Sequence, residues 1–367
     1  MEKASTEEGR NLARPPESEG VIAMSLVENG IKNEARFPED VAPSRVATTA
    51  RHVSPTFALE LYRTMALIRE IEDAIQPLYN AGEIYGTTHL CSGEEAICVG
   101  VCSVLDARRD RIAATYRGHG HSIALGSDPQ SLLDELFGRA TGTSGGRAGS
   151  MNIIDLQHGL MGCFGIVGGS IAAATGAALA LKGSGAIAVA FFGDGAANQA
   201  YFHECLNFAA VFELPVMFVC ENNLYGEFTP WEQVTAGEIS ARPMAMGIPT
   251  VRLDGNDIWE VRDCATGFVG EMRSKGGPRF IEAITYRLGG HSRSDQATYR
   301  PPGELDAWKV RDPLVLERAH LTDELGVDSA TLAQLDTEIR SEVAAMVEHA
   351  RAAPWPVSDA APTEFAP

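Results

Sequence analysis

Residues 186–226 read AIAVAFFGDGAANQAYFHECLNFAAVFELPVMFVCENNLYG. The stretch opens with an apolar run over 186–192, turns at Gly-Asp-Gly, and reaches a second apolar run over 215–221 after a helical pattern. Strands that are apolar on both faces and separated by a helix indicate a parallel sheet covered by helices on both sides. This stretch therefore predicts an α/β fold.

The sequence on either side extends the same alternation. Apolar residues recur at helical spacing from Phe57 to Tyr79, which predicts a long amphipathic helix. The other expected elements are helices at 94–105, 129–139, 168–180, 197–212, 257–274, 304–320 and 329–351, and strands at 111–115, 249–253 and 279–286. The predicted fold class is a mostly parallel sheet covered by helices on both faces, with helical additions.

Three segments of unequal size are predicted along the chain. Residues 1–52 mix charge, Pro, Ser and Ala without periodicity, which indicates a flexible or partner-wrapping extension. The folded domain is expected over 53–353, and 354–367 is a Pro- and Ala-rich tail that we expect to be loose. Inside the domain, 142–149 is too rich in glycine for the interior of a helix or strand and suits a ligand-contacting loop.

The overall charge narrows the classes of partner. Lys and Arg number 30 against 49 Asp and Glu, a formal net charge of −19, which disfavours nucleic acid because its phosphates require basic surfaces. The apolar runs fall short of the roughly 18 residues of a membrane span, and early acids such as Glu7 and Glu8 argue against a signal or transit peptide. The seven cysteines are expected to be reduced core thiols. We therefore expect a cytoplasmic protein with neither nucleic acid nor membrane as a partner.

A carboxylate follows the first strand at the point where a ligand is expected. Ligands of open α/β sheets bind at the carboxyl ends of the strands, and the start of a helix favours phosphate. Asp194 would repel a phosphate unless a divalent cation lies between them, and Mg²⁺ commonly bridges carboxylate and phosphate oxygens. Gly193 and Gly195 flank the carboxylate, and glycine lets the backbone approach a ligand closely.

The second strand ends in a pair of asparagines followed by Leu224 and Tyr225. Neighbouring parallel strands bring their carboxyl ends together, so Asn223, 29 residues after Asp194 (223 − 194), can offer its amide oxygen to the same cation. A backbone carbonyl near Tyr225 would add a third protein oxygen. A diphosphate bound through Mg²⁺ is the predicted ligand.

Gly-Asp-Gly followed by Asn-Asn about thirty residues later is the thiamine diphosphate motif, and residues 193–226 resemble the alpha subunits of pyruvate and acetoin dehydrogenases. The resemblance extends over roughly residues 56–350. It implies thiamine diphosphate and Mg²⁺ as cofactors, with Asp194, Asn223 and Tyr225 as the metal ligands.

The resemblance also assigns further residues to the cofactor. The family's Tyr-Arg pair corresponds to Tyr116 and Arg117, and its guanidinium meets the diphosphate, a task that suits a planar fork of donors. The Gly-Ile-Val-Gly stretch at 165–168 is implied to support the aminopyrimidine ring. The complete set implied to bind the cofactor is Tyr116, Arg117, Gly165, Val167, Gly193, Asp194, Gly195, Ala196, Asn223, Tyr225, Arg287 and His291.

Two histidines are implied to be catalytic. His89 in THLCSGEEA and His291 in TYRLGGHSRSD match the family's active-site histidines, which face the reactive end of the cofactor. Imidazole can steer a carboxylate or transfer a proton near neutral pH. The loop 292–299 matches a family loop that orders over the cofactor and carries regulatory phosphoserines in mitochondrial enzymes; whether this chain is phosphorylated stays open.

A catalytic glutamate is expected to come from another chain. In this family the glutamate that contacts the aminopyrimidine belongs to a separate beta subunit, and we recognise no second thiamine half-domain in the sequence. The resemblance therefore implies an α₂β₂ heterotetramer that is inactive without the beta subunit, with a lipoyl-bearing acyltransferase core as a further partner. The implied reaction is oxidative decarboxylation of pyruvate or a similar small 2-oxo acid, with acyl transfer to lipoamide.

The choice of substrate stays open between related enzymes. Acetoin cleavage is the first alternative, because the sequences around His89 and over 202–204 look closest to acetoin-type alpha subunits. Branched-chain 2-oxo acids rank third, since those enzymes usually lack the Gly-Ile-Val-Gly stretch. Asn152 stands where many relatives have His, and Gly289 replaces a bulkier residue of some pyruvate enzymes. Both departures put the substrate in doubt.

Two readings of other classes are also considered. A cofactor-less regulatory relative is disfavoured by the joint presence of Asp194, Asn223 and Arg117. A nicotinamide dehydrogenase is disfavoured because the Gly-Asp-Gly turn lacks the G-x-G-x-x-G pattern and the ribose-binding acid that should follow it.

Overall fold

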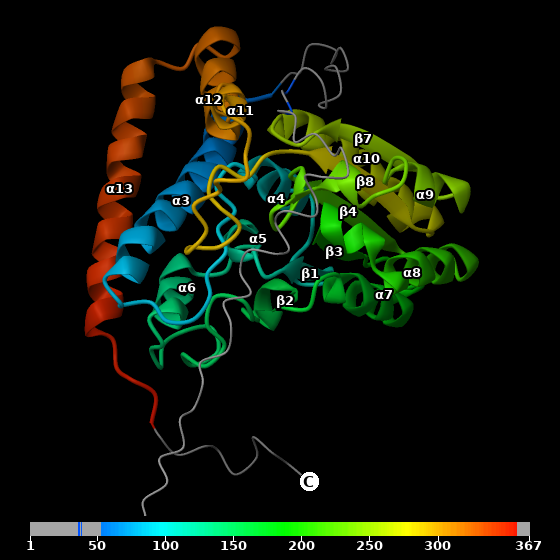
Figure 1. Ribbon diagram of the computed structural model, residues 1–367, viewed down its shortest axis with the longest axis horizontal. Helices are drawn as coiled ribbons and strands as arrows, with labels where there is room; N and C mark the ends of the chain where they lie inside the picture. Colours follow the sequence, from blue (N-terminus) through cyan, green and yellow to red (C-terminus); the bar gives the residue numbers. More distant parts are fainter. Residues whose placement is uncertain (1–35, 37, 39–52, 358–367) are drawn as a thin grey trace, which may run out of the picture. The chain divides into compact units, whose positions relative to one another are not determined.

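Six parallel strands form the sheet at the centre of the fold (Figure 1). The computed structural model describes Arg36, Pro38 and residues 53–357, so most of the predicted extension over 1–52 and of the tail after 353 lies outside the described residues. In spatial order the strands are β2 (Leu160–Phe164), β1 (Arg111–Thr115), β3 (Ala188–Gly193), β4 (Val216–Asn222), β8 (Arg279–Ile284) and β7 (Thr250–Asp254). Every pairing between neighbours in this sheet is parallel, which confirms the predicted fold class.

The central strands send alternate side chains into two apolar cores, one on each face of the sheet. Along β3, Val189 and Phe191 belong to one core, whereas Ala190 and Phe192 belong to the other. All residues of β4 and β8 are buried. Because both faces are covered, these strands carry no alternation of apolar and polar residues.

Helices cover both faces of the sheet. One core includes side chains of α3 (Pro55–Asn80), α4 (Glu95–Cys102), α10 (Ile258–Lys275) and α13 (Ser329–Ala352). The other core includes α7 (Gly169–Leu181) and α8 (Ala200–Val211), which lie on the right of Figure 1, away from α3 and α13 on the left. Within the described part of the chain, none of the helices combines the length and apolar character needed to cross a membrane.

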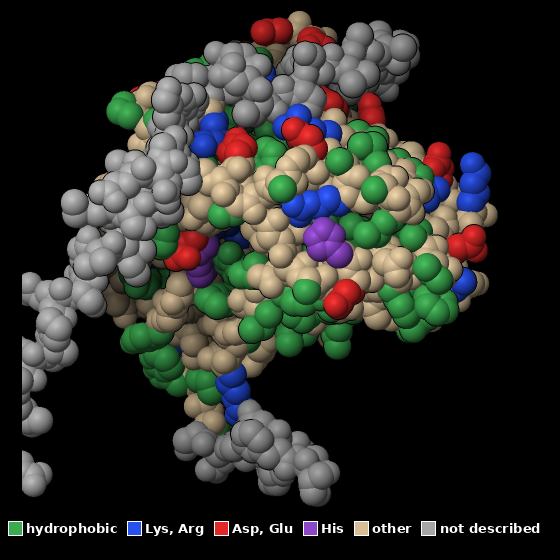
Figure 2. Space-filling view, turned by 45° about the vertical axis from the view of Figure 1, so that its right-hand side comes forward, with side chains coloured by type: hydrophobic (Ala, Val, Ile, Leu, Met, Phe, Trp, Pro, Cys, Tyr) green, Lys and Arg blue, Asp and Glu red, His purple; other side chains and the backbone are tan. Residues whose placement is uncertain are grey.

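The outer sides of α7 and α8 leave apolar residues exposed. The large ones are Leu179, Phe208, Val211 and Phe212. Hydrophobic side chains are visible along the lower part of the face in Figure 2. The inner side of α7 is built from small residues, and Ser170 donates a 2.7 Å hydrogen bond to the carbonyl of Phe191 in β3, so the helix lies close against the sheet.

Several elements differ from the prediction. The expected helix over 304–320 is two helices, α11 (Glu304–Lys309) and α12 (Pro313–Ala319), because Pro313 starts a new helix and the Asp312 side chain caps it at the amide of Leu314, 2.8 Å away. The structure also contains elements that were not predicted from the sequence: β2, α5 (His119–Ala124), α9 (Ala241–Ala245) and the short antiparallel pair β5 (Tyr225–Gly226) and β6 (Thr229–Pro230). The predicted helix over 129–139 is α6 (Pro129–Leu136).

One buried carboxylate organises the glycine-rich loop over 142–149. Glu135 on α6 accepts hydrogen bonds from four backbone amides of this loop, at Ser144, Gly146, Ala148 and Gly149, over distances of 2.7 to 3.1 Å. The glycines are therefore required by a backbone that wraps around one side chain. The loop continues into Met151 and Asn152, which a Cβ atom at Gly165 would contact.

Candidate active site

The two strand ends that were expected to share a ligand are neighbours. Gly193 of β3 pairs with Glu221 of β4 in the parallel register, so Asp194 and Asn223 follow adjacent strands at the same edge of the sheet. Asp194 begins a short 3₁₀ turn (Asp194–Asn198) that precedes α8. The chain therefore delivers a carboxylate and an amide to one place, as the apolar runs predicted.

A cavity of about 440 Å³ opens beside Asp194. Its walls come from the ends of β1, β2 and β3 and from the loops that follow β2, β6 and β8. The predicted cofactor residues that line it are Tyr116, Val167, Gly193, Asp194, Gly195, Ala196 and His291. The remaining predicted residues, His89, Arg117, Gly165, Asn223, Tyr225 and Arg287, are not part of its lining.

Asp194 is a buried carboxylate with one unsatisfied oxygen among the described residues. Its side chain is only 2% exposed, and Oδ2 has no hydrogen-bond partner among the described residues. Burial raises the pKa of Asp194 to about 7, although the positive charge of Arg287 opposes this rise. Gly226 lies beside the carboxylate, and a Cβ atom there would be 3.8 Å from Oδ2. A buried carboxylate oxygen without a partner is costly unless a cation or donor meets it.

Asn223 and Tyr225 offer oxygens rather than charges. The Nδ2 atom of Asn223 donates to Oε1 of Glu94 at 2.9 Å, while its Oδ1 lies 3.4 Å from the amide of Tyr225. The hydroxyl of Tyr225 donates to Glu304 at 2.6 Å, and the predicted ligand from this residue is its backbone carbonyl. The described residues contain no group of three His, Cys, Asp or Glu side chains able to hold a metal ion. One carboxylate with amide and carbonyl oxygens fits Mg²⁺, a hard cation that keeps several non-protein ligands.

The side chain of Tyr225 is held by Glu304, and Glu304 is in turn bound by Arg36. Glu304, which is fully buried, also accepts a hydrogen bond from Tyr286 at 2.8 Å and one from the backbone amide of Arg36 at 2.7 Å. The Nε atom of Arg36 donates to Glu232 at 2.8 Å. Arg36 thus fixes the segment that runs from Tyr225 toward Glu232 along one wall of the cavity.

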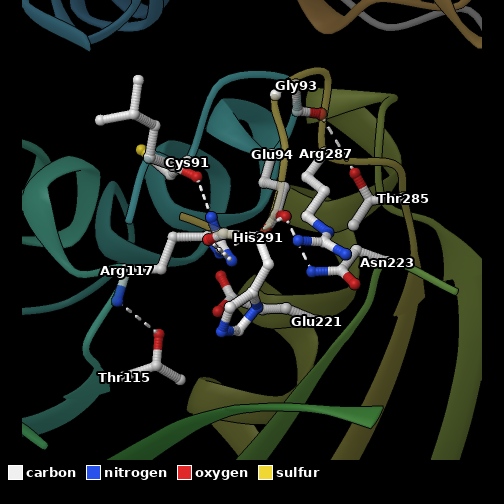
Figure 3. Close-up of polar contacts among 12 residues, drawn as sticks. Cys91, Gly93, Glu94, Thr115, Arg117, Glu221, Asn223, Thr285, Arg287 and His291 are labelled. Carbon is white, nitrogen blue, oxygen red and sulfur yellow. Dashed lines mark hydrogen bonds and ion pairs between the residues drawn. The ribbon is translucent and has the colours of Figure 1, made fainter. Parts of the chain in front are cut away.

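Two arginines converge on the strand ends but differ in how their donors are used (Figure 3). Arg117 donates to the carbonyls of Leu90 and His291, the latter at 3.2 Å. Arg287 donates through Nη2 to the carbonyl of Glu227 and to the hydroxyl of Tyr299, whereas its Nε and Nη1 have no partner among the described residues. Arg287 therefore has the unused donors that an anionic group would need.

The two predicted histidines lie together beside Tyr116. The ring of His89 is 4.5 Å from that of Tyr116 and 4.8 Å from that of His291. Burial lowers the pKa of His89 to about 3 and that of His291 to about 4, and the charge of Arg117 acts in the same direction on both. Both rings are therefore neutral at neutral pH, and the buried Nδ1 of His89 has no partner among the described residues.

Apolar side chains stand exposed at the mouth of the cavity. Ile166 is 71% and Val167 is 42% exposed, and both line the cavity wall. Gly168, with φ +77°, ends this loop and starts α7. A Cβ atom at Gly168 would lie 2.9 Å from the ring of Tyr201, whose hydroxyl donates to the carbonyl of Val167. The exposed apolar pair is thus fixed by the backbone and faces a space that a ligand or partner can fill.

Buried acids near the strand ends were not predicted from the sequence. Glu94, 2% exposed, accepts the amide of Asn223, and burial raises its pKa to about 8 while the charge of Arg117 opposes this. Glu221 forms a 2.9 Å hydrogen bond with Nε2 of His121. Glu94 stood in the quoted GEEA stretch, but its contact spans 129 residues of sequence and no spacing rule indicates it.

Comparison with known proteins identifies clear relatives. A family model described as dehydrogenase E1 component matches residues 63–358. The alpha subunit of acetoin:2,6-dichlorophenolindophenol oxidoreductase from Bacillus subtilis (strain 168) is 41% identical over 303 residues, which cover 82% of this chain and 90% of the relative. The subunit of the same name from Cupriavidus necator is 42% identical over 305 residues, 81% of this chain and 90% of the relative. The pyruvate dehydrogenase E1 component subunit alpha of Zymomonas mobilis subsp. mobilis is 40% identical over 312 residues, 84% and 88% of the two chains.

Proposed function

The chain belongs to the dehydrogenase E1 component family, and we propose that it is the alpha subunit of a 2-oxo acid dehydrogenase that decarboxylates pyruvate or a similar small 2-oxo acid. The proposed cofactors are thiamine diphosphate and Mg²⁺, and the proposed acceptor of the acyl group is lipoamide on an acyltransferase core. The relatives named as pyruvate dehydrogenase E1 alpha subunits support this substrate class.

The observation that carries the proposal is the unpartnered carboxylate at the edge of the sheet. Oδ2 of Asp194 is buried and meets no donor from the part of the chain that the structure describes, and it follows a strand that pairs with the strand leading to Asn223. A cation beside Asp194 would explain a buried aspartate in that environment. A diphosphate bound in the 440 Å³ cavity would in turn explain why a cation is needed there. The donor set fits the group that the family implies.

Different residues of this chain are proposed to bind Mg²⁺ and the diphosphate. Asp194, Asn223 and the carbonyl of Tyr225 would hold Mg²⁺, while Arg287 would offer Nε and Nη1 to the diphosphate, with Arg117 beside it. The chemistry that thiamine diphosphate supplies when bound is attack on the substrate carbonyl and stabilisation of the charge left after CO₂ departs.

Residues at the cavity wall, and His89 next to it, would orient the cofactor. The exposed side chains of Ile166 and Val167 would pack against its rings and exclude water. His89 and His291, neutral at neutral pH, can each accept or donate a hydrogen bond at the reacting end without adding positive charge. The beta subunit is proposed to cover this mouth and to supply the glutamate that the chemistry needs.

Co-production tests the proposal. The full chain is expressed with and without the protein encoded beside it, and each preparation is assayed for bound thiamine diphosphate and for reductive acylation of lipoamide with pyruvate, acetoin and branched 2-oxo acids. We expect cofactor and pyruvate-dependent acylation in the mixed complex alone. A mixed complex that binds no thiamine diphosphate would overturn the proposal in favour of a regulatory relative.

Acetoin cleavage is the second candidate, and the comparisons give it specific support. Two relatives at 41% and 42% identity are alpha subunits named for acetoin:2,6-dichlorophenolindophenol oxidoreductase activity. The same mixed complex distinguishes the two substrates, because reduction of 2,6-dichlorophenolindophenol can be followed with either acetoin or pyruvate. Faster turnover with acetoin would assign the chain to that activity while leaving the cofactor site unchanged.

A further inference from the structure

We propose that Glu94 is a positioning residue that fixes the orientation of the Asn223 side chain, so that the amide oxygen rather than the amide nitrogen faces the cation. The inference rests on the proposed function, because it concerns the proposed cation site. Glu94 lies between Arg117 and Asn223 in Figure 3, and its Oε1 accepts from Nδ2 of Asn223 at 2.9 Å. Both side chains are buried, at 2% and 8% exposed.

The two ends of an asparagine side chain differ in whether they can bind a cation. They have nearly the same shape, but only the oxygen can bind a cation, since the NH₂ group presents hydrogens. The terminal torsion of asparagine has a broad preference, so neighbouring groups must select the orientation. A carboxyl oxygen without a proton accepts from Nδ2 and would repel Oδ1, which makes the flipped orientation costly in a buried site. The positive charge of Arg117, 3.9 Å from Oε1, and the hydrogen bond from Asn223 both favour this form of Glu94.

The opposite end of the amide is left available. Oδ1 of Asn223 lies 3.4 Å from the amide of Tyr225, a long hydrogen bond that leaves a lone pair for a stronger ligand. The same turn continues to Gly226, where a Cβ atom would lie 3.8 Å from Oδ2 of Asp194. The oxygen of Asn223 thus faces away from Glu94, toward the turn that leads to the carboxylate of Asp194.

Glu94 is itself held firmly. It lies between Gly93 and the first residue of α4. Gly93 fixes the backbone there, because its φ is +98° and a Cβ atom would collide with the carbonyl of Tyr286. Thr285 donates to the carbonyl of Gly93 at 3.1 Å. Nε of Arg117 lies 3.9 Å from Oε1 of Glu94. The acceptor is therefore located by the backbone and by charge, as orientation of a ligand requires.

The neighbouring asparagine provides a matched comparison. Asn222 donates through Nδ2 to Oε1 of Glu282, also at 2.9 Å, and both side chains are fully buried. Glu282 lies on β8 and also accepts the amide of Ser240 at 3.2 Å. Two consecutive asparagines are thus bound to two buried glutamates, but only Asn223 is a proposed ligand. Removing Glu282 tests loss of a buried acceptor alone.

The test measures Mg²⁺ affinity in the full chain co-produced with its partner. Mg²⁺ is titrated in the presence of thiamine diphosphate and binding is followed by intrinsic fluorescence and calorimetry. Glu94→Leu is expected to weaken Mg²⁺ binding by about tenfold or more, and Glu94→Gln, which keeps an acceptor oxygen, by less than about threefold. Glu282→Leu should lower the melting temperature and leave the Mg²⁺ affinity within about threefold of the wild type.

A second background isolates orientation from folding. In Asn223→Asp both terminal atoms are oxygens, so adding Glu94→Leu should cost less than about threefold in Mg²⁺ affinity. Wild-type affinity in an assembled Glu94→Leu protein, or a Glu94→Gln protein as weak as Glu94→Leu, overturns the inference. If Glu94→Leu does not assemble, Glu94→Met replaces it. A wild-type complex without Mg²⁺-dependent cofactor binding overturns the proposed function as well.

Discussion

Replacing Asp194 with asparagine is expected to stabilise the cofactor-free protein while it removes Mg²⁺-dependent binding of thiamine diphosphate. The two effects have opposite signs because one side chain is unfavourable for folding and favourable for the cation. The carboxylate is 2% exposed with Oδ2 unpartnered among the described residues, and burial raises its pKa. Asparagine has nearly the same shape without the charge.

The magnitude follows from the pKa of Asp194. A rise from 3.8 to about 7 corresponds to roughly 4 kcal/mol in the free energy of unfolding above pH 7. The folded state holds this proton more tightly than the unfolded state, so the wild-type protein loses this stability as the pH rises from about 4 to about 7. We expect the Asp194→Asn variant to be more stable by about 2 to 4 kcal/mol at pH 8, and by little at pH 4.

Urea denaturation of the metal-free protein at pH 4 to 8 measures the first effect, and Mg²⁺ titration with thiamine diphosphate measures the second. Asp110→Asn is the matched control, because this fully buried aspartate accepts from Ile187 at 3.0 Å and from Arg273 at 2.5 Å and should lose stability when neutralised. The reasoning is refuted if Asp194→Asn is no more stable than the wild type at pH 8, or if it keeps Mg²⁺-dependent binding.

Three further changes test other parts of the structure. Glu135→Gln should destabilise the protein by about 1 to 3 kcal/mol, since the carboxylate accepts four loop amides; urea denaturation measures the loss. Gly168→Ala should cost about 1 to 3 kcal/mol because φ is +77° and the Cβ meets a ring at 2.9 Å, whereas Gly176→Ala, with open space, should gain about 0.5 to 1 kcal/mol. His89→Gln should flatten the fall in stability between pH 6.5 and 4 by up to about 1 kcal/mol per pH unit, since burial lowers the pKa of His89.

Each of these has a result that would contradict it. Equal stability of Glu135→Gln and the wild type would mean that the loop amides are satisfied elsewhere. Similar melting temperatures for Gly168→Ala and Gly176→Ala would remove the argument from backbone conformation. If the stability of His89→Gln falls between pH 6.5 and 4 as steeply as that of the wild type, the imidazole of His89 accepts a proton as easily in the folded as in the unfolded state.

The sequence was sufficient for the central sheet and for the meeting of two strand ends. The runs that became β3 and β4 are apolar throughout, and parallel pairing of such strands leaves their carboxyl ends side by side, which brought Asp194 and Asn223 to one edge. The edge strand β2 was missed because Gly162 stands in the middle of its five residues, so no continuous apolar run marks it. Asp312 and Pro313 form a capping signal that starts α12. The helical pattern continues on both sides of this signal, so a single helix was predicted.

The contacts around the site could not be read in the same way. Glu94 meets Asn223 across 129 residues, and Arg36 meets Glu304 across 268. Such pairs depend on how helices and loops pack onto the finished sheet, and a single sequence contains no periodicity that reports them. The roles assigned to Arg117 and Gly165 came from resemblance alone, and they stay predictions.

The way Glu135 holds its loop has a practical consequence. A carboxylate that binds backbone amides does not depend on the side chains of those residues. The course of the loop therefore depends on glycine at Gly145, Gly146 and Gly149, where φ is positive, and hardly on the side chain of Ser144. A fluorescent amino acid genetically encoded at position 144 should therefore leave the polypeptide path unchanged.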